Sequence, residues 1–536
     1  MKSEKGTRLA TAAIIVMSSM VLSRVTGFVR ETMLSWKVGL SWVQDAYNVA
    51  FTVPDLMYTL LVGGTISAAL IPLLSSYIEK GEDEEGWKST STFINTIFIG
   101  MVVLCVLGVV LAPWIIPLVA PGFSQKSPET KELAIKLMRI LFPSVSFIML
   151  AGICNGVLNS YKKFAAAAYG PSIYNLGCTL SILIFADVNS ESMVKVAIGV
   201  ACSAAVYFLF QLSFALGNIR LYRFVIDWSN RGFKKLIRQA IPSLLSSSIV
   251  QINVIIAIFF VSLSLMEGNV SAYKNANTVW QLPYGIFAMG IGTAMLPTLS
   301  RKFAAGDFDE YRNILMKSMT SVLFLSMPSA VGFIILREPV IRAIFAWGGR
   351  FGEDKVPVVA EIMAVFSVAM ITQSIVATMN RAFYARQDTK TPLMVGLGTV
   401  AMNFGFGFLF YRTTNLGAVG MALTYSIIST VNSVLLMILL NKKMQGIHLD
   451  RFLRFTLKAL PASLAMGAVL WLLNMVPIHL STKPLQLLYL LLEITAGAAV
   501  YLLVMLLLKS DEALYFLRLV KDKIKRKKCK NMQVDH

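Results

Sequence analysis

The chain has 536 residues, of which 56% are hydrophobic and 15% are charged, and it carries a formal net charge of +20. Soluble domains carry about 25% charged residues, so this composition excludes an ordinary soluble protein and indicates a chain that crosses a membrane many times. Its five cysteines show neither a disulfide framework nor a metal-binding spacing, and the common enzyme motifs are missing. The sequence therefore favours a transporter without catalytic residue, metal site or cofactor.

Fourteen apolar stretches, each long enough to cross a bilayer as a helix, follow one another along the chain. They begin near residues 9, 46, 93, 133, 164, 193, 239, 276, 314, 357, 391, 416, 455 and 485. Most Lys and Arg fall in the segments that are cytoplasmic if both termini lie inside, which is the usual bias of membrane proteins. This placement accounts for the positive charge without a nucleic-acid partner. We expect an all-α polytopic membrane protein with about 14 transmembrane helices.

The first predicted helix carries charges where a membrane helix is normally apolar. Its stretch "SRVTGFVRE" ends at Glu31 and follows an uncharged apolar run. At 100° per residue, Ser23, Arg24, Arg30 and Glu31 fall on one stripe about 120° wide, centred on Gly27. Either Glu31 neutralises one arginine while the other extends to the membrane surface, or the arginines line a cavity for an anionic ligand such as a phosphate. We prefer the second interpretation, because one positive charge is left without a local partner.

The second predicted helix adds two carboxylates, Asp45 at its start and Asp55 within it, as further candidate partners. Asp45 also fits a simple helix-end residue. Later helices contribute amide side chains that either line the same cavity or join neighbouring helices by hydrogen bonds. These are Gln251, Asn253, Asn277 and Gln281. We expect no acidic residue deep in a span outside the first two helices, so no proton or sodium site is predicted.

The first twelve helices contain an internal repeat. Two pairs of residues lie 225 positions apart, namely Pro72 with Pro297 and Gly81 with Gly306, and a weaker similarity joins residues 155–171 to 380–392. Because this period spans six helices, both copies enter the membrane in the same direction, and the substrate path is expected between them. The predicted organisation is two six-helix bundles at 1–225 and 226–445, two additional helices at 446–510, and a cytoplasmic basic tail at 511–536 that binds anionic lipid.

Together these stretches resemble a known family, the MurJ (MviN) lipid II flippases of the MOP exporter superfamily. The matching pieces are "SRVTGFVRE", "DAYNVAFTVPDL", "GGTISAALIPLLSSY", "QLPYGIFAMGIGTAMLPTLSRKFAAGDFDEYRNILMKSM" and "FYARQDTKTP". The resemblance covers nearly the whole chain, including the two additional helices. It implies that a polyprenyl-diphosphate-linked cell-wall precursor crosses the inner membrane through a central cationic cavity, by alternating access.

The resemblance also implies site residues. Ser23, Arg24, Arg30 and Asp45 match cavity or gate positions of the family, and Glu31 stands in place of an aspartate. The groove between helices 13 and 14 would hold the long lipid tail. The full set of predicted cavity residues is Ser23, Arg24, Arg30, Glu31, Asp45, Asp55, Lys274, Asn277 and Gln281.

The chain departs from the family in helices 2 and 8. After the proline of helix 2 the family usually carries an Arg pair and then Glu-Gly, where this chain has Tyr58, Thr59, Gly63 and Gly64. Before the proline of helix 8 the family usually carries an Arg and a Glu, where this chain has Thr278 and Gln281. Lys274 is a candidate substitute for the missing arginine, although a lysine there also fits a solvated loop.

The resemblance therefore implies a flippase that carries lipid II from the inner to the outer leaflet of the bacterial cytoplasmic membrane, for peptidoglycan synthesis. Three alternatives stay open: a flippase for another lipid-linked oligosaccharide, a small-molecule exporter of the same superfamily, and an inactive scaffold that recruits cell-envelope enzymes. The expected partners are the lipid-linked precursor, membrane lipids and cell-wall synthesis enzymes. The chain is expected to be a monomer with both termini in the cytoplasm.

Overall fold

The computed structural model describes residues 2–60, 66, 69–264, 266–475 and 482–518. The regular elements among these residues are all helices, so the predicted all-α fold is confirmed. Two compact units are described separately. Unit 1 is Met1–Thr278, Gly348–Lys355 and Gly396–Met421, and unit 2 is Val279–Trp347, Val356–Val395 and Ala422–His536. The predicted domain boundaries at 225, 445 and 510 stay predictions.

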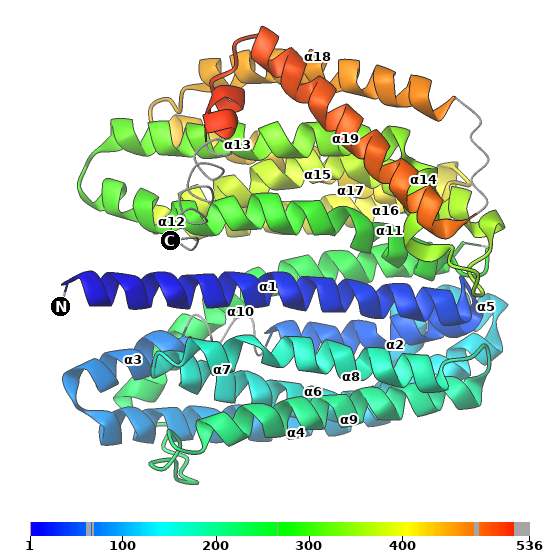
Figure 1. The fold of residues 1–536 in the computed structure, drawn as a ribbon. Helices are drawn as coiled ribbons and strands as arrows, with labels where there is room; N and C mark the ends of the chain where they lie inside the picture. Colours follow the sequence, from blue (N-terminus) through cyan, green and yellow to red (C-terminus); the bar gives the residue numbers. More distant parts are fainter. Residues whose placement is uncertain (1, 61–65, 67–68, 265, 476–481, 519–536) are drawn as a thin grey trace, which may run out of the picture. The chain divides into compact units, whose positions relative to one another are not determined.

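Unit 1 contains ten helices and the start of an eleventh. They are α1 (Lys2–Val38), α2 (Trp42–Tyr58), α3 (Ile71–Lys80), α4 (Asp83–Val119), α5 (Pro121–Lys126), α6 (Pro128–Ser160), α7 (Phe164–Ala168), α8 (Gly170–Phe185), α9 (Ser190–Ala215), α10 (Arg231–Ser262) and the first residues of α11 (Asn269–Tyr284). The long helix α6 packs against α2, α4 and α9, and α8 packs against α1 and α9 (Figure 1). This packing sets α1, α2 and α8 around the site described below.

Unit 2 begins within α11, which continues through a π-helical turn (η2, Gly285–Met289) into α12 (Gly290–Ala304). Its other helices are α13 (Phe308–Ile335), α14 (Arg337–Phe345), α15 (Val356–Ala385), α18 (Leu449–Asn474) and α19 (Lys483–Leu507). The helices α16 (Lys390–Thr413) and α17 (Gly417–Lys443) contribute residues to both units, and a short 3₁₀ turn (η3, Glu353–Lys355) belongs to unit 1. The helix α13 packs against α15 and α18, and α18 packs against α19.

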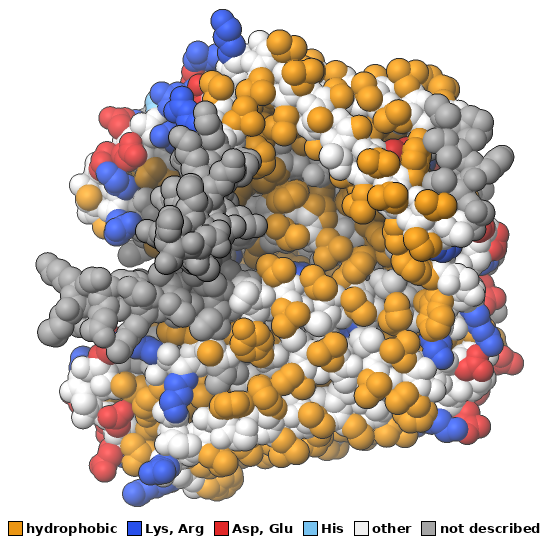
Figure 2. Space-filling view, viewed as in Figure 1, with side chains coloured by type: hydrophobic (Ala, Val, Ile, Leu, Met, Phe, Trp, Pro, Cys, Tyr) orange, Lys and Arg blue, Asp and Glu red, His pale blue; other side chains and the backbone are white. Residues whose placement is uncertain are grey.

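The helices have the length and surface of membrane-spanning segments. Ten helices within the described residues are long and apolar enough to cross a bilayer. Each predicted span begins inside a helix or one residue before it, while the number fourteen stays a prediction. In each unit, charged side chains gather toward the two ends of the helices, and hydrophobic side chains cover the length between them (Figure 2). The chain is therefore a multi-pass membrane protein.

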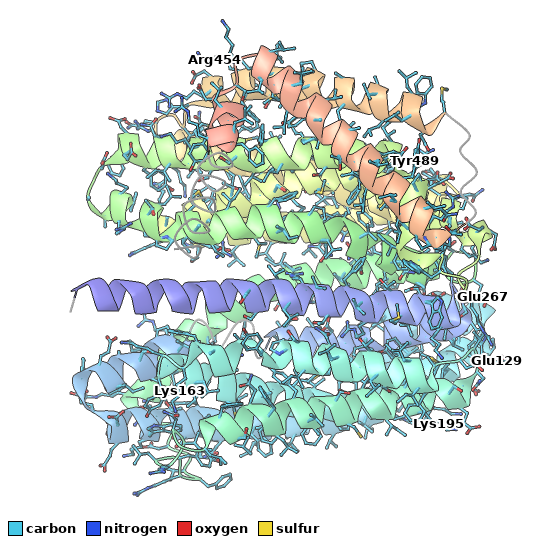
Figure 3. The ribbon with its side chains drawn as sticks, viewed as in Figure 1. Glu129, Lys163, Lys195, Glu267, Arg454 and Tyr489 are labelled. Carbon is cyan, nitrogen blue, oxygen red and sulfur yellow. The ribbon has the colours of Figure 1, made fainter. Side chains whose placement is uncertain are left out.

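Successive connections of unit 1 alternate between its two ends. Figure 3 shows Lys163, which follows α6, at one end of this unit. It shows Glu129 at the start of α6, Lys195 in the first turns of α9 and Glu267 just before α11 at the opposite end. This alternation agrees with helices that cross a membrane in turn. Which end faces the cytoplasm stays a prediction.

The sequence repeat is visible in the backbone. Gly81 after α3 and Gly306 after α12 both adopt a left-handed conformation, with φ of 75° and 71°. The weaker pair of stretches shows the same correspondence, because Lys162 and Gln387 have φ of 60° and 61°. Residues other than glycine adopt positive φ only rarely. Two such residues at the same 225-residue spacing therefore support a true structural repeat.

One expectation about the acidic residues was wrong. Glu493 lies near the middle of α19, and its side chain is buried with 2% exposure. Its Oε1 atom accepts no hydrogen bond from the described residues. The sequence interpretation overlooked Glu493 because a single acid barely changes the hydropathy of a long apolar stretch. Gly63, Gly64 and residues 519–536 of the predicted basic tail lie outside the described residues.

Candidate functional site

A cavity of about 300 Å³ in unit 1 brings charged side chains from three helices together. Arg30 and Glu31 come from α1, Asp55 comes from α2 and Lys274 comes from α11. Aromatic and polar side chains complete the wall; they include Tyr47, Phe51, Tyr58, Ser144, Tyr174, Asn175 and Tyr207. The cavity is therefore a polar chamber within a membrane protein, which is where such proteins keep functional charges.

Glu31 lies between two cations. Its Oε1 atom is 2.7 Å from Nη2 of Arg30, and its Oε2 atom is 3.7 Å from Nζ of Lys274. The Glu31 side chain is only 9% exposed, whereas those of Arg30 and Lys274 are 23% and 33% exposed. Oε2 of Glu31 accepts no hydrogen bond within the described part of the chain. One carboxylate therefore bridges two positive groups that both reach the cavity.

Asn175 on α8 fixes the position of Arg30. Its Oδ1 atom accepts a hydrogen bond of 3.2 Å from Nη1 of Arg30, and its Nδ2 atom donates one of 3.3 Å to the backbone oxygen of Ser23. Asn175 also lies against Gly27, because a Cβ atom there would be 3.4 Å from Nδ2 of Asn175, which is an ordinary van der Waals contact. The centre of the predicted polar stripe is thus covered by α8, and the stripe does not face the cavity along its whole length.

Lys274 is held by a network that starts on α2. Its Nζ atom donates a hydrogen bond of 2.9 Å to Oδ1 of Asn48, and Nδ2 of Asn48 donates one of 3.1 Å to Oγ of Ser271. Ser271 in turn donates its hydroxyl hydrogen to Asp45 at 2.6 Å. The lysine is therefore an ordered side chain of a helix. The alternative of a freely solvated loop lysine does not describe it.

Asp45 accepts hydrogen bonds from backbone N–H groups at the start of α11. Besides the Ser271 hydroxyl, it accepts hydrogen bonds from the backbone nitrogens of Gly268 at 3.0 Å and Ser271 at 2.8 Å. A carboxylate at the start of a helix satisfies free N–H groups there and is favoured by the helix dipole. Asp45 lines a separate hollow of about 240 Å³ together with Glu267, so the structure does not bring it into the cavity of Arg30.

The other predicted residues lie outside this cavity. Ser23 is half-buried, and Arg24 is exposed and makes no ion pair or hydrogen bond with another described residue. Asn277 and Gln281 are half-buried on α11, and Gln281 belongs to unit 2. The structure thus gathers Arg30, Glu31, Asp55 and Lys274, but the binding role of all nine residues stays a prediction.

Sequence analysis missed Asn175 and the tyrosines of the cavity wall. The tyrosines were overlooked because aromatic residues in membrane helices usually indicate packing. Tyr58 carried a signal, since it stands where the family usually has an arginine. Its neighbour Thr59 accepts a hydrogen bond of 3.1 Å from Gln251, and Asn253 accepts one of 2.8 Å from Asn403. These two amides join helices, as one of the two interpretations of the sequence proposed.

Comparison with known proteins gives consistent results. A family model described as lipid II flippase MurJ matches residues 35–491. A probable lipid II flippase MurJ of Buchnera aphidicola subsp. Acyrthosiphon pisum is 29% identical over 453 residues, which are 84% of this chain and 87% of the relative. The lipid II flippase MurJ of Burkholderia cenocepacia is 27% identical over 478 residues, which are 86% of this chain and 89% of the relative.

Solved structures match over similar lengths. A structure described as lipid II flippase MurJ in an inward closed conformation has a TM-score of 0.77 and 25% identity, and the match covers 95% of this chain and all of that one. A multidrug resistance MATE family transporter of the MOP superfamily, in an inward-facing conformation, has a TM-score of 0.68 and 17% identity. That match covers 81% of this chain and 98% of the transporter, and at this identity it shows a shared fold only.

Proposed function

This chain belongs to the MurJ family of lipid II flippases, and we propose that it carries lipid II from the inner to the outer leaflet of the bacterial cytoplasmic membrane. The cargo is a polyprenyl-diphosphate-linked precursor of peptidoglycan. The observation that carries the proposal is the cavity in which Arg30 and Lys274 flank Glu31, 2.7 and 3.7 Å from its two oxygens. Both cations reach a space that a diphosphate can enter.

The diphosphate would take the place of the Glu31 carboxylate between the two cations. The planar guanidinium of Arg30 can contact two phosphate oxygens at once, and the ammonium of Lys274 adds a point charge on the other side. Glu31 keeps the two cations apart and ordered until the anion arrives. Arg24, Ser23, Asn277 and Gln281 would contact other parts of the cargo or act during the conformational change.

The residues of helices 2 and 8 that depart from the family change how the diphosphate would be bound, rather than which class of cargo is carried. Tyr58 lines the cavity at a position where the family usually carries an arginine. Lys274 supplies a positive charge near the missing arginine of helix 8, and Asn48 orders it through a hydrogen bond of 2.9 Å. We propose that Arg30 and Lys274 together form a two-cation clamp, which suffices for one diphosphate.

The chain would work by alternating access as a transporter, with no catalytic step, and both termini would lie in the cytoplasm. We propose that it acts as a monomer near the enzymes of cell-wall synthesis. A small-molecule exporter of the same superfamily would need an acidic site for cationic substrates. The cavity has as many cations as acids, and Glu31 is paired with both cations, so this alternative is not favoured.

Complementation tests the proposal. The chain is expressed in a bacterium whose own lipid II flippase is depleted, and growth is measured together with the membrane level of the chain. The parent chain and an Arg454→Ala control are expected to restore growth, because Arg454 is exposed, pairs with Asp450 on α18 and does not line the cavity. An Arg30→Ala, Lys274→Ala double variant is expected to fail at equal abundance. Equal growth with this double variant would contradict the proposed role of Arg30 and Lys274. Failure of the parent chain to restore growth would contradict lipid II as the cargo.

A further inference from the structure

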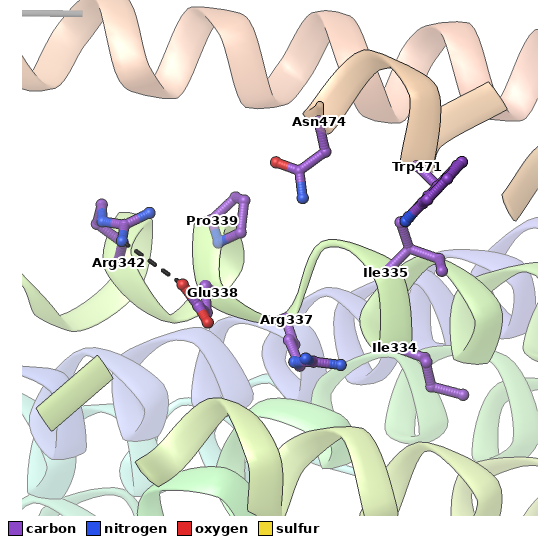
Figure 4. A pocket seen from close by; sticks show the side chains of 8 residues that line it. All are labelled: Ile334, Ile335, Arg337, Glu338, Pro339, Arg342, Trp471 and Asn474. Carbon is purple, nitrogen blue, oxygen red and sulfur yellow. Dashed lines mark ion pairs between the residues drawn. The ribbon is translucent and has the colours of Figure 1, made fainter. Parts of the chain in front are cut away.

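A second cavity, of about 460 Å³, lies within unit 2 at the point where three helix ends meet. It is formed by the end of α13, the start of α14 and the end of α18 (Figure 4). The polar side chains that line it are Arg337, Glu338, Arg342 and Asn474, and the indole of Trp471 borders it. No residue of the first cavity takes part.

The two arginines of this second cavity differ in their partners. Nη2 of Arg342 lies 3.9 Å from Oε2 of Glu338, so this arginine has an acidic neighbour. Arg337 is exposed and forms no ion pair or hydrogen bond with another described residue. In Figure 4 the side chain of Asn474 extends from the end of α18 toward α14, on the far side of the opening from Arg337.

The cavity lies at the end of a helix that is long enough to reach the lipid headgroups. The helix α18 has 26 residues, so it is about 39 Å long, whereas the hydrocarbon core is about 30 Å thick. Trp471 is in the last turn of α18 and is 50% exposed. Tryptophan gathers at the boundary between hydrocarbon and headgroups, because its ring is apolar and its N–H is polar. Arg337 and Asn474 are therefore placed where phosphate groups of lipids are found.

The buried face of α14 does not include Arg337. This face carries Val340, Ile341 and Phe345, which are all buried and fix the helix in the unit. A positive group that neither packs nor pairs has little structural reason to line a cavity. An anion that enters the cavity would supply the missing partner.

From these contacts we infer that the cavity between α14 and the end of α18 binds the phosphate of an anionic membrane lipid. The guanidinium of Arg337 contacts the phosphate oxygens, the amide of Asn474 donates a hydrogen bond, and Trp471 packs against the apolar part of the lipid. The lipid is either a phospholipid of the bilayer or a polyprenyl diphosphate. The inference uses none of the residues of the two-cation clamp and does not depend on cargo transport.

Native mass spectrometry of the purified full chain in detergent tests this inference. The chain is titrated with phosphatidylglycerol in one arm and with a polyprenyl diphosphate in the other. Arg337→Gln is expected to weaken binding of one of these lipids roughly tenfold, the size expected when one hydrogen bond to a charged group is lost. The lipid affinity of Arg337→Lys is expected to be intermediate, because lysine keeps the charge but lacks the planar guanidinium that can contact two phosphate oxygens.

Arg412→Gln is the matched control. Arg412 is an exposed arginine near the end of α16 and lies outside the cavity, so its replacement should leave both affinities unchanged. The arm that weakens identifies the lipid. The Arg337 effect should persist in an Arg30→Ala background, which separates this site from the clamp. Equal binding of both lipids by the parent chain and the Arg337→Gln variant, with equal melting temperatures, would overturn the inference.

Discussion

The ammonium nitrogen of Lys274 lies 3.7 Å from Oε2 of Glu31 and 2.9 Å from Oδ1 of Asn48, so this lysine joins α11 to both α1 and α2. In the sequence, Lys274 and Glu31 are far apart and belong to helices 8 and 1 of the predicted order. Their meeting in one cavity supports Lys274 as the second cation of the proposed clamp.

Arg30→Ala is expected to reduce transport roughly tenfold or more, the effect of losing a charge-assisted contact to a phosphate. Arg30→Lys should recover part of the activity, because an ammonium keeps the charge without the two-pronged geometry. The measurement is lipid II translocation in proteoliposomes, with protein content matched. Transport by Arg30→Ala at the rate of the parent chain would show that Arg30 only neutralises Glu31.

Arg24 provides a separate test, because it is exposed and has no partner among the described residues. If it contacts the cargo, Arg24→Ala should cripple transport while the chain still inserts. Arg24→Leu should behave in the same way, since it keeps bulk and removes charge. A variant that inserts and transports as well as the parent chain would identify Arg24 as a residue that merely extends to the membrane surface.

Lys274 and Glu31 should be energetically coupled. Lys274→Met and Glu31→Gln are measured singly and together, and cargo affinity is the readout. For residues in contact, the double-mutant cycle is expected to give a coupling of about 0.5–3 kcal/mol. The same cycle with Lys274→Met and Asp450→Asn, which lies at the start of α18, should give additive effects. Additivity of the Glu31 pair would contradict a shared site.

Glu493→Leu is expected to stabilise the protein. The carboxyl of Glu493 is buried in α19, and its Oε1 atom has no hydrogen-bond partner among the described residues. Burying such a group without a partner costs about 1–3 kcal/mol, which leucine would recover. Thermal unfolding of the purified chain should show a higher melting temperature for Glu493→Leu and little change for Glu493→Gln, which stays polar. Loss of transport in a well-folded Glu493→Leu variant would instead reveal a functional acid.

The topology is tested by cysteine labelling in intact cells. In a Cys202→Ala background, Ser229→Cys should be protected from a membrane-impermeant reagent, because the basic segment 218–238 is predicted to be cytoplasmic. Glu191→Cys should react, because the connection before α9 is predicted to lie outside. Asp187 in that connection pairs with Arg350 at 2.7 Å, so Gly348→Cys should react as well. Labelling of Ser229→Cys from outside would reverse the assignment.

The helical order and the repeat could be predicted from the sequence because both leave local signals. Apolar stretches of membrane length mark the spans, and Gly81 and Gly306 mark equivalent turns. The positive φ of Lys162 and Gln387 could not be predicted, since no residue preference indicates it, although their stretches had been matched. The fixed 225-residue spacing therefore identified equivalent turns better than the residue types at those turns did.

The site was predicted only in part, because local sequence patterns do not indicate which side chains of distant helices contact each other. The stripe on α1 identified Arg30 and Glu31, but a helical wheel cannot show that Asn175 covers its centre. Asp45 looked like a cavity acid, yet its hydrogen bonds to the backbone of α11 depend on how α2 and α11 meet. The sequence identified candidate residues, but their hydrogen-bond and ion-pair partners depend on how the helices pack.

The two acids and two bases of the cavity have an electrical consequence. The formal charges of Arg30, Lys274, Glu31 and Asp55 cancel, so these four groups together would present no net charge to the membrane field. With the diphosphate bound, the same region becomes negative. Each charge that crosses the full field changes the free energy by about 2.3 kcal/mol per 100 mV. A membrane potential that is negative inside would therefore favour outward movement of the site with its bound diphosphate. The four cavity groups would add no electrical free energy to the return of the site without cargo.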